Sequence, residues 1–164
     1  MSDQSEANAA GVDFAVVAFR EEGVWQVEQL PEAIEDLDHL ARELRRWPGD
    51  GGCLGLLSVD EDFLLIVRVL GSQTRVLLSD ITAATEWPIA RSVVEHLELP
   101  LPEDDDEPLP AGDIGIVADL GMDAMDLGAL LDDLDLYPDE MLSEVASRLG
   151  FGRQFDDAIG VTAS

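Results

Sequence analysis

The sequence predicts an α+β protein in which a five-stranded antiparallel sheet is followed by a small helical C-terminal unit. Three observations predict this class. Short runs of β-branched and other apolar residues are separated by turns of hairpin length, two stretches with helical spacing interrupt these runs, and the last third is rich in leucine at three- and four-residue spacing. The expected element order up to residue 98 is ββαβββα.

The first two strands are expected to form a hairpin. Residues 13–20, DFAVVAFR, are apolar and β-branched, and residues 21–23, EEG, form a turn signal. In the VWQVEQL that follows, Trp25 and Val27 fall on the face opposite to the residues that alternate with them. This pattern is typical of a β-hairpin.

Residues 31–47, PEAIEDLDHLARELRRW, predict an amphipathic helix. Its apolar residues recur every three or four positions, its acids come early and its arginines come late, as the helix macrodipole favours. Pro48 and Gly49 are expected to end it.

Three further strands are predicted, at residues 53–59 (CLGLLSV), 63–70 (FLLIVRVL) and 74–79 (TRVLLS). Their connectors are of hairpin length, so the three should form an antiparallel meander. The middle run is apolar almost throughout, which indicates a central strand covered on both faces.

A second helix is expected in WPIARSVVEHLEL, with Asp80 as a cap before it and Pro88 at its first position. With this helix the order ββαβββα is complete. It is similar to the order in longin, roadblock and profilin-type domains, a likeness that concerns architecture and carries no function.

The stretch LPEDDDEPLP, residues 101–110, predicts a stiff, solvated spacer. Proline restricts the residue before it to extended conformations, and neighbouring carboxylates repel one another. The expected organisation is a disordered N-terminus, a sheet domain, an acidic proline-flanked linker, a helical unit and a disordered tail, at residues 1–12, 13–98, 99–111, 112–159 and 160–164.

The helical unit is expected to carry two apolar stripes. Pro138 should open its last long helix and Gly150 should close it in a left-handed conformation. Helices of about ten residues cannot bury a stripe alone, so they must pack on one another or on the sheet. The residues of this unit that we expect at the surface, available to a partner, are Met125, Leu130, Val145 and Phe151.

The net charge of −27, with nine arginines and no lysine, opposes direct contact with nucleic acid or anionic lipid. It favours a basic protein surface as partner, and the residues expected to meet it in the spacer are Glu103, Asp104, Asp105, Asp106 and Glu107. No apolar run approaches the length of a membrane span, and the first residues are polar and acidic, so we expect a cytoplasmic protein. The oligomeric state stays open.

Neither aspartate cluster has the pattern of a metal site. The acids of the spacer are contiguous and no glycine follows in register, whereas a calcium loop alternates its ligands and turns at glycine. Asp133 and Asp135 have calcium-loop spacing, but Tyr137 and Pro138 occupy the next ligand and glycine positions. We expect no metal and no cofactor.

The sequence also lacks a recognisable catalytic motif. Cys53 is the only cysteine and is expected to be a buried free thiol, and His39 and His96 are expected on helix surfaces. No glycine-rich phosphate loop, zinc constellation or nucleophile elbow occurs. These residues predict a protein that is not an enzyme.

Four strings carry a resemblance to a known family: DFAVVAFREEGVW, FLLIVRV with TRVLLSD, DIGIVADLG, and PDEMLSEVASRLGF. In this order, around an acidic spacer, they resemble the tRNA adenosine deaminase-associated proteins of actinobacteria, over residues 13–157. The resemblance implies association with the zinc enzyme that converts adenosine to inosine in tRNA, and it implies no catalytic residues. The chain lacks the H-x-E and P-C-x-x-C elements of a deaminase, so it cannot be that enzyme.

Three hypotheses of function follow. The leading one is a non-enzymatic acidic interaction protein that acts as an accessory or regulator of the tRNA adenosine deaminase, whose tRNA-binding face must be cationic. The second is a general nucleic-acid mimic that binds several basic partners. The third is an enzyme with an unrecognised site, suggested only by the abundance of carboxylates.

Overall fold

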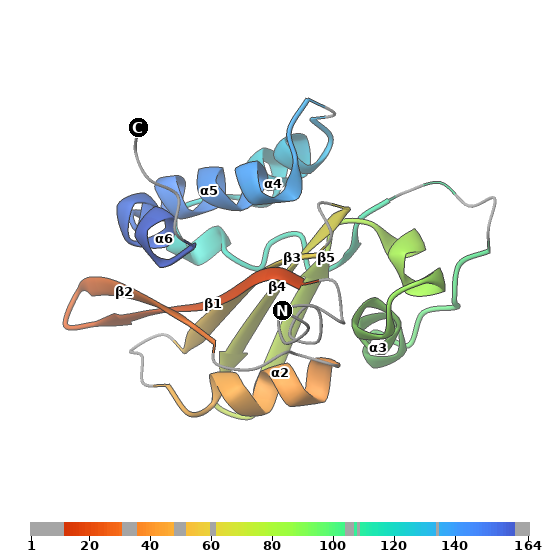
Figure 1. Ribbon diagram of the computed structural model, residues 1–164, viewed down its shortest axis with the longest axis horizontal. Coiled ribbons are helices and arrows are strands. Elements are labelled where there is room, and N and C mark those ends of the chain that lie inside the picture. The colour runs from red at the N-terminus through yellow and green to blue at the C-terminus, as the bar shows by residue number, and fades with distance from the viewer. Residues whose placement is uncertain are drawn as a thin grey trace, which may run out of the picture.

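The computed structural model describes residues 12–30, 36–47, 52–59, 62–103, 107, 109–133 and 135–159. A six-stranded antiparallel sheet lies between two layers of helices, in the strand order β2-β1-β3-β4-β5-β6 (Figure 1). The strands are β1 (Val12–Glu21), β2 (Val24–Gln29), β3 (Cys53–Val59), β4 (Phe63–Leu70), β5 (Gln73–Leu78) and β6 (Ala111–Gly112). The α-helices are α2 (Leu37–Leu44), α3 (Pro88–His96), α4 (Ala124–Leu131), α5 (Pro138–Leu149) and α6 (Gly152–Ile159), and the 3₁₀-helices are η1 (Ile81–Thr85) and η2 (Ala118–Leu120).

The predicted α+β class, the antiparallel sheet and the order ββαβββα are confirmed, but the predicted count of five strands is wrong. The sixth strand, β6, has two residues, and they pair with β5 at Leu78↔Ala111 and Leu77↔Gly112. A strand this short has no periodicity to detect, and its identity depends on a partner distant in the sequence. The likeness to longin and roadblock order stays a prediction.

The β1–β2 hairpin turns at Glu22 and Gly23, which both have positive φ, as a two-residue hairpin turn requires. Trp25 lies on the covered face of β2, and its ring centroid lies 4.7 Å from that of Phe151, in the loop between α5 and α6. The side chain of Gln154 also donates to the Trp25 carbonyl (3.2 Å), so α6 is attached to this edge strand.

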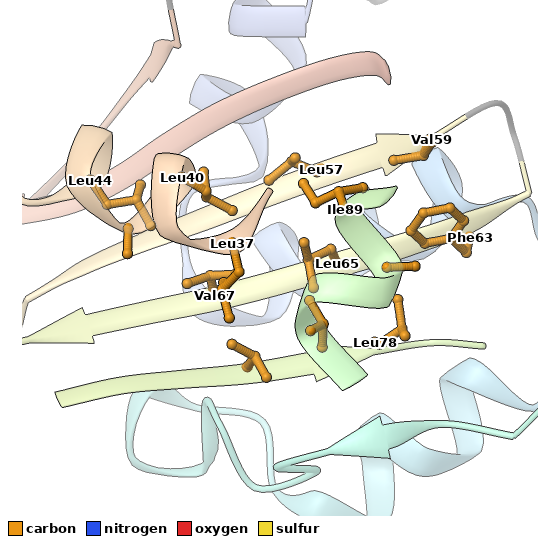
Figure 2. Packing of buried hydrophobic residues seen from close by; sticks show 14 of the residues in the cluster. Leu37, Leu40, Leu44, Leu57, Val59, Phe63, Leu65, Val67, Leu78 and Ile89 are labelled. Carbon is orange, nitrogen blue, oxygen red and sulfur yellow. The ribbon is translucent and has the colours of Figure 1, made fainter. Parts of the chain in front are cut away.

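Helices α2 and α3 cover one face of the sheet. Asp36 caps α2 by accepting a hydrogen bond from the backbone N–H of His39 (2.8 Å). Figure 2 shows the leucines of α2 and Ile89 of α3 above side chains of β3, β4 and β5. The predicted role of Asp80 is corrected in detail: it caps η1, and α3 begins after Trp87 with Pro88 in its first turn.

Helices α4, α5 and α6 cover the other face. Successive side chains of β3 and β4 contribute alternately to the two layers, so every residue of β3 and all but the last of β4 are buried. This confirms the prediction that the middle strand of the meander is covered on both faces. The helices after residue 112 share their core with the sheet, in a cluster that contains Leu56, Ile66, Leu142, Val145 and Phe155.

The predicted domain boundaries stay a prediction, since the shared core does not test whether each part folds alone. The predicted disordered ends, residues 1–12 and 160–164, lie outside the described residues except for Val12, the first residue of β1.

Two arginines hold the connection from β6 to α4 against the sheet. Arg68 of β4 donates to both carboxylate oxygens of Asp119 (2.5 and 3.0 Å) and to the carbonyl of Ile116 (3.1 Å). Arg75, its cross-strand neighbour on β5, donates to Asp113 (2.5 Å). The chain between β6 and α4 is therefore held against the sheet where it leads to the layer of α4–α6.

Candidate docking surface

The acidic spacer begins after α3, in the layer that covers one face of the sheet, and leads back to the sheet at its edge strand β6 (Figure 1). It leaves through Glu98, which has a left-handed φ of 59°, and it returns at Leu109, whose carbonyl accepts a hydrogen bond from the N–H of Ile81 (2.8 Å). The pairing of β6 with β5 follows directly. Both ends of the spacer are thus fixed to the rest of the fold.

The described ends of the spacer form one side of a hollow of about 420 Å³, which we call the apolar hollow. Its lining residues are Ile81, Leu99, Pro100, Leu101, Pro102, Glu107 and Leu109. Three of them are large apolar side chains with high exposure: Leu99 at 40%, Leu101 at 49% and Leu109 at 56%. Clustered exposed apolar side chains are typical of interaction sites, because water contact with them is unfavourable.

A second hollow of about 340 Å³, the acidic hollow, lies next to the first. Its lining residues are Asp62, Ser79, Asp80, Pro110, Leu131, Asp132, Leu136, Tyr137, Pro138 and Met141. A ridge made of residues 80–81 and 109–110 separates the two hollows. Ile81 and Leu109 line the apolar hollow, and their sequence neighbours Asp80 and Pro110 line the acidic hollow. We call the surface formed by both hollows and this ridge the docking surface.

The ridge is held by side-chain hydrogen bonds. Asp80 accepts from the N–H and the hydroxyl of Thr82 (2.8 and 2.5 Å), and the hydroxyl of Ser79 accepts from the N–H of Leu64 (2.9 Å). The ridge of the docking surface is therefore attached to the end of the sheet.

Three aspartates, Asp62, Asp80 and Asp132, line the acidic hollow. Asp132 is the C-cap of α4, and the last turn of this helix contains no basic residue. A helix C-terminus has a partial negative charge, so an acid at this position is unfavourable and a cation would be favourable. No arginine is found among the described residues that line either hollow.

The arginines of the sheet lie at its opposite end. Arg20 stands near the end of β1, Arg68 near the end of β4 and Arg75 near the start of β5, and Arg45 joins them by donating to Thr74 (2.9 Å). Arg20 is placed over the ring of Trp25, 5.2 Å from its centroid. These arginines thus stand at the end of the strands away from the docking surface.

The structure places the residues predicted for partner contact in different environments. In the spacer, Glu107 lines the apolar hollow and Glu103 is exposed, while residues 104–106 (Asp104, Asp105 and Asp106) lie outside the described residues. On α4, Met125 is 83% exposed, and Leu130 is partly buried against the core.

The expectation that Val145 and Phe151 are surface residues is wrong, because both are 0% exposed. The apolar stripe of α5 faces the sheet, and Phe151 packs on Trp25. Neither side chain can contact a partner while these helices stay on the sheet.

Sequence reasoning missed the apolar side chains of the docking surface, namely Leu99, Leu101, Leu109 and Tyr137. A signal existed, since leucine alternates with proline on both sides of the acids in LPLPEDDDEPLP. Proline keeps these segments out of helices, so the leucines had no place in a helical stripe and were not assigned a role.

The described residues include one cysteine and no candidate metal cluster. Cys53 is buried, its thiol donates to the carbonyl of Trp47 (3.1 Å), and burial raises its pKa, which disfavours the reactive thiolate. Within the described ranges no group of three or more histidine, cysteine, aspartate and glutamate side chains could hold a metal ion. None of the helices in these ranges combines the length and apolar composition that a membrane span requires.

Comparison with known proteins identifies the family. Residues 13–152 match the family described as Rv3753c-like tRNA adenosine deaminase-associated protein. The chain belongs to this family. The deaminase-associated family also contains a relative named Protein Rv3753c, from Mycobacterium tuberculosis (strain ATCC 25618 / H37Rv), which is 41% identical over 150 residues and covers 89% of this chain and 87% of its own length. No solved structure matches the chain significantly.

Proposed function

We propose that this protein is a non-enzymatic, cytoplasmic accessory protein that binds the tRNA adenosine deaminase through the docking surface. The observation that carries the proposal is an exposed apolar hollow at the end of the sheet, beside a hollow lined by three aspartates, with no arginine among the described lining residues of either. The description of the family as deaminase-associated supports the choice of partner.

Charge complementarity gives the physical reason. An enzyme that acts on tRNA must present cations to phosphate, and an acidic protein is attracted to the same cations. Acidic charge steers the encounter, whereas the apolar side chains of the docking surface supply contacts that persist in salt.

The test is to purify both proteins, measure their association between about 50 and 200 mM salt, and then titrate tRNA into the complex while inosine formation is followed. We expect a complex that weakens with salt and whose formation changes the rate of inosine formation. Displacement by tRNA would indicate that the two compete for one face, and a ternary complex would indicate an adaptor. Absence of a complex at every salt concentration would refute the proposal.

Two variants locate the contact. Leu101→Ser removes an apolar side chain from the docking surface, and Leu70→Ser is its control, because Leu70 is exposed to a similar extent (45%) on the last residue of β4, at the other end of the sheet. Leu101→Ser should weaken the complex and Leu70→Ser should not. Equal affinity of both variants would place the contact elsewhere.

A second candidate function is binding to several basic proteins, as a nucleic-acid mimic. It is favoured by the spread of acids along the whole chain, 36 in total against nine arginines. Co-purification from native cells at moderate salt separates the candidates: one dominant partner supports the accessory role, and many basic partners support the mimic.

A further inference from the structure

We propose that the docking surface receives one short basic segment of a protein partner, with a large apolar side chain in the apolar hollow and an arginine or lysine in the acidic hollow. This inference rests on the proposed function and names the kind of element that the partner contributes. It starts from the ridge of residues 80–81 and 109–110, because Asp80 and Pro110 line one hollow and their sequence neighbours line the other, so one segment that crosses the ridge can place a side chain in each.

The apolar hollow selects an apolar side chain. Leucine and proline make up most of its lining, and Glu107 is its only charged lining residue among those described. A side chain that enters it would remove its own apolar surface and that of Leu101 and Leu109 from water. The surrounding fold is already ordered at Ile81 and Leu109, which lowers the cost of binding.

The acidic hollow selects a cation. Asp62, Asp80 and Asp132 line it, and the C-terminal end of α4 adds its partial negative charge. Tyr137, 60% exposed, offers an aromatic ring to the same cation. A metal ion does not fit, because no group of acids in the described residues is arranged to hold one.

Two other occupants are disfavoured by charge. Nucleic acid would bring phosphates against carboxylates. A second copy of this chain would bring the same acids, and four of its nine arginines are already paired, Arg46 with Glu43, Arg68 with Asp119, Arg75 with Asp113 and Arg148 with Asp126. The occupant that both hollows favour is a segment of another protein that contains basic and apolar side chains.

The test uses the full chain and a synthetic peptide with one tryptophan among arginines. Its two control peptides replace tryptophan by alanine, or the arginines by glutamine. Binding is measured by fluorescence anisotropy at about 150 mM salt, and the site is located by chemical-shift changes of backbone amides. We expect shifts concentrated at Ile81, Leu101, Leu109 and Tyr137, and at least tenfold weaker binding of either control peptide.

Variants of the protein complete the test. Leu101→Ser and Asp132→Asn should each weaken peptide binding several-fold, whereas their controls Leu70→Ser and Glu144→Gln, both exposed and away from the two hollows, should leave it unchanged. Shifts spread over all acidic residues, or affinity that is insensitive to Leu101→Ser, would show general charge attraction and overturn the inference. Binding of a short RNA at the docking surface, or concentration-dependent shifts there without peptide, would overturn it as well.

The outcomes distinguish this inference from the proposed function. If the deaminase binds with equal affinity to the protein and to the Leu101→Ser and Asp132→Asn variants, the accessory role stands and the inference falls. If the peptide occupies both hollows but the deaminase does not bind, the inference stands and the choice of partner falls.

Discussion

Removal of the Asp119 carboxylate should destabilise the protein more than removal of the Asp113 carboxylate, although both aspartates hold the same connection. Arg68 is only 4% exposed, so Asp119→Ala leaves a buried guanidinium without its carboxylate. Breaking a buried ion pair costs about 3–5 kcal/mol, and since the Asp119 side chain itself is 61% exposed we expect water to reduce this to about 2–3 kcal/mol.

The pair of Arg75 and Asp113 provides the comparison. Both side chains are partly exposed, 36% and 37%, and pairs of this kind contribute about 0–1 kcal/mol. Asp113 also accepts from the N–H of Gly115 (3.0 Å), which adds about 1 kcal/mol. Asp113→Ala should therefore cost about 1–2 kcal/mol, less than Asp119→Ala.

The assay is urea unfolding followed by tryptophan fluorescence and circular dichroism. A double-mutant cycle with Arg68→Met isolates the contribution of the ion pair. In the Arg68→Met background the buried cation is gone, so the further loss of stability from Asp119→Ala should be close to zero. The reasoning is refuted if Asp119→Ala and Asp113→Ala lose equal stability, or if the loss from Asp119→Ala is unchanged in the Arg68→Met background.

Three further predictions concern the same connection and the ends of the spacer. The hydrogen bond from Arg68 lowers the pKa of Asp119 in the folded protein. The ionised Asp119 therefore contributes stability above the unfolded pKa of about 3.9, and this contribution is lost as pH falls through the folded pKa. The difference in urea stability between the protein and Asp119→Ala should shrink below about pH 4 and stay constant above about pH 6. Gly112 has a φ of +110°, and Gly112→Ala would place a Cβ 2.3 Å from the carbonyl oxygen of Val76. This variant should lose about 3 kcal/mol of stability and show faster amide exchange in β6. The control Gly128→Ala, on α4 with nothing within 4 Å of the added Cβ, should gain about 0.5–1 kcal/mol. Glu98 has a left-handed φ of 59°, which glycine adopts without strain, so Glu98→Gly should raise stability by up to about 1 kcal/mol. The control Glu95→Gly, inside α3, should lower stability by about 1 kcal/mol. A loss of stability in Glu98→Gly would show that the conformation of Glu98 is not strained.

Features of the fold that depend on local chemistry could be predicted from the sequence. Pro88 and Pro138 lie in the first turns of their helices and Gly150 is a left-handed cap, because each preference is a property of one residue and its own backbone. The burial of β4 was also predictable, since a run without polar alternation requires cover on both faces.

Features that depend on distant partners could not be predicted. The apolar residues of α5 recur at helical spacing, but periodicity does not say that Val145 faces the sheet and is closed to solvent. The apolar hollow requires Ile81 and Leu109 to meet through a backbone hydrogen bond, and nothing in the spacer sequence specifies that contact. Among the described lining residues, only Glu107 had been predicted for partner contact, and the aspartates of the acidic hollow were missed together with the apolar side chains.

The position of the docking surface follows from how the fold carries its charge. A net charge of −27 opposes compact folding through self-repulsion, and the sheet offsets this by burying apolar side chains on both faces. Along the strands, arginines reduce the repulsion at one end, where Arg68 and Arg75 pair with Asp119 and Asp113. At the other end the described lining of the hollows has no arginine, and Asp132 adds its charge to the negative end of α4. The aspartates of the acidic hollow thus lie beside the exposed leucines of the spacer, so a basic partner would relieve their repulsion and cover the leucines in the same step.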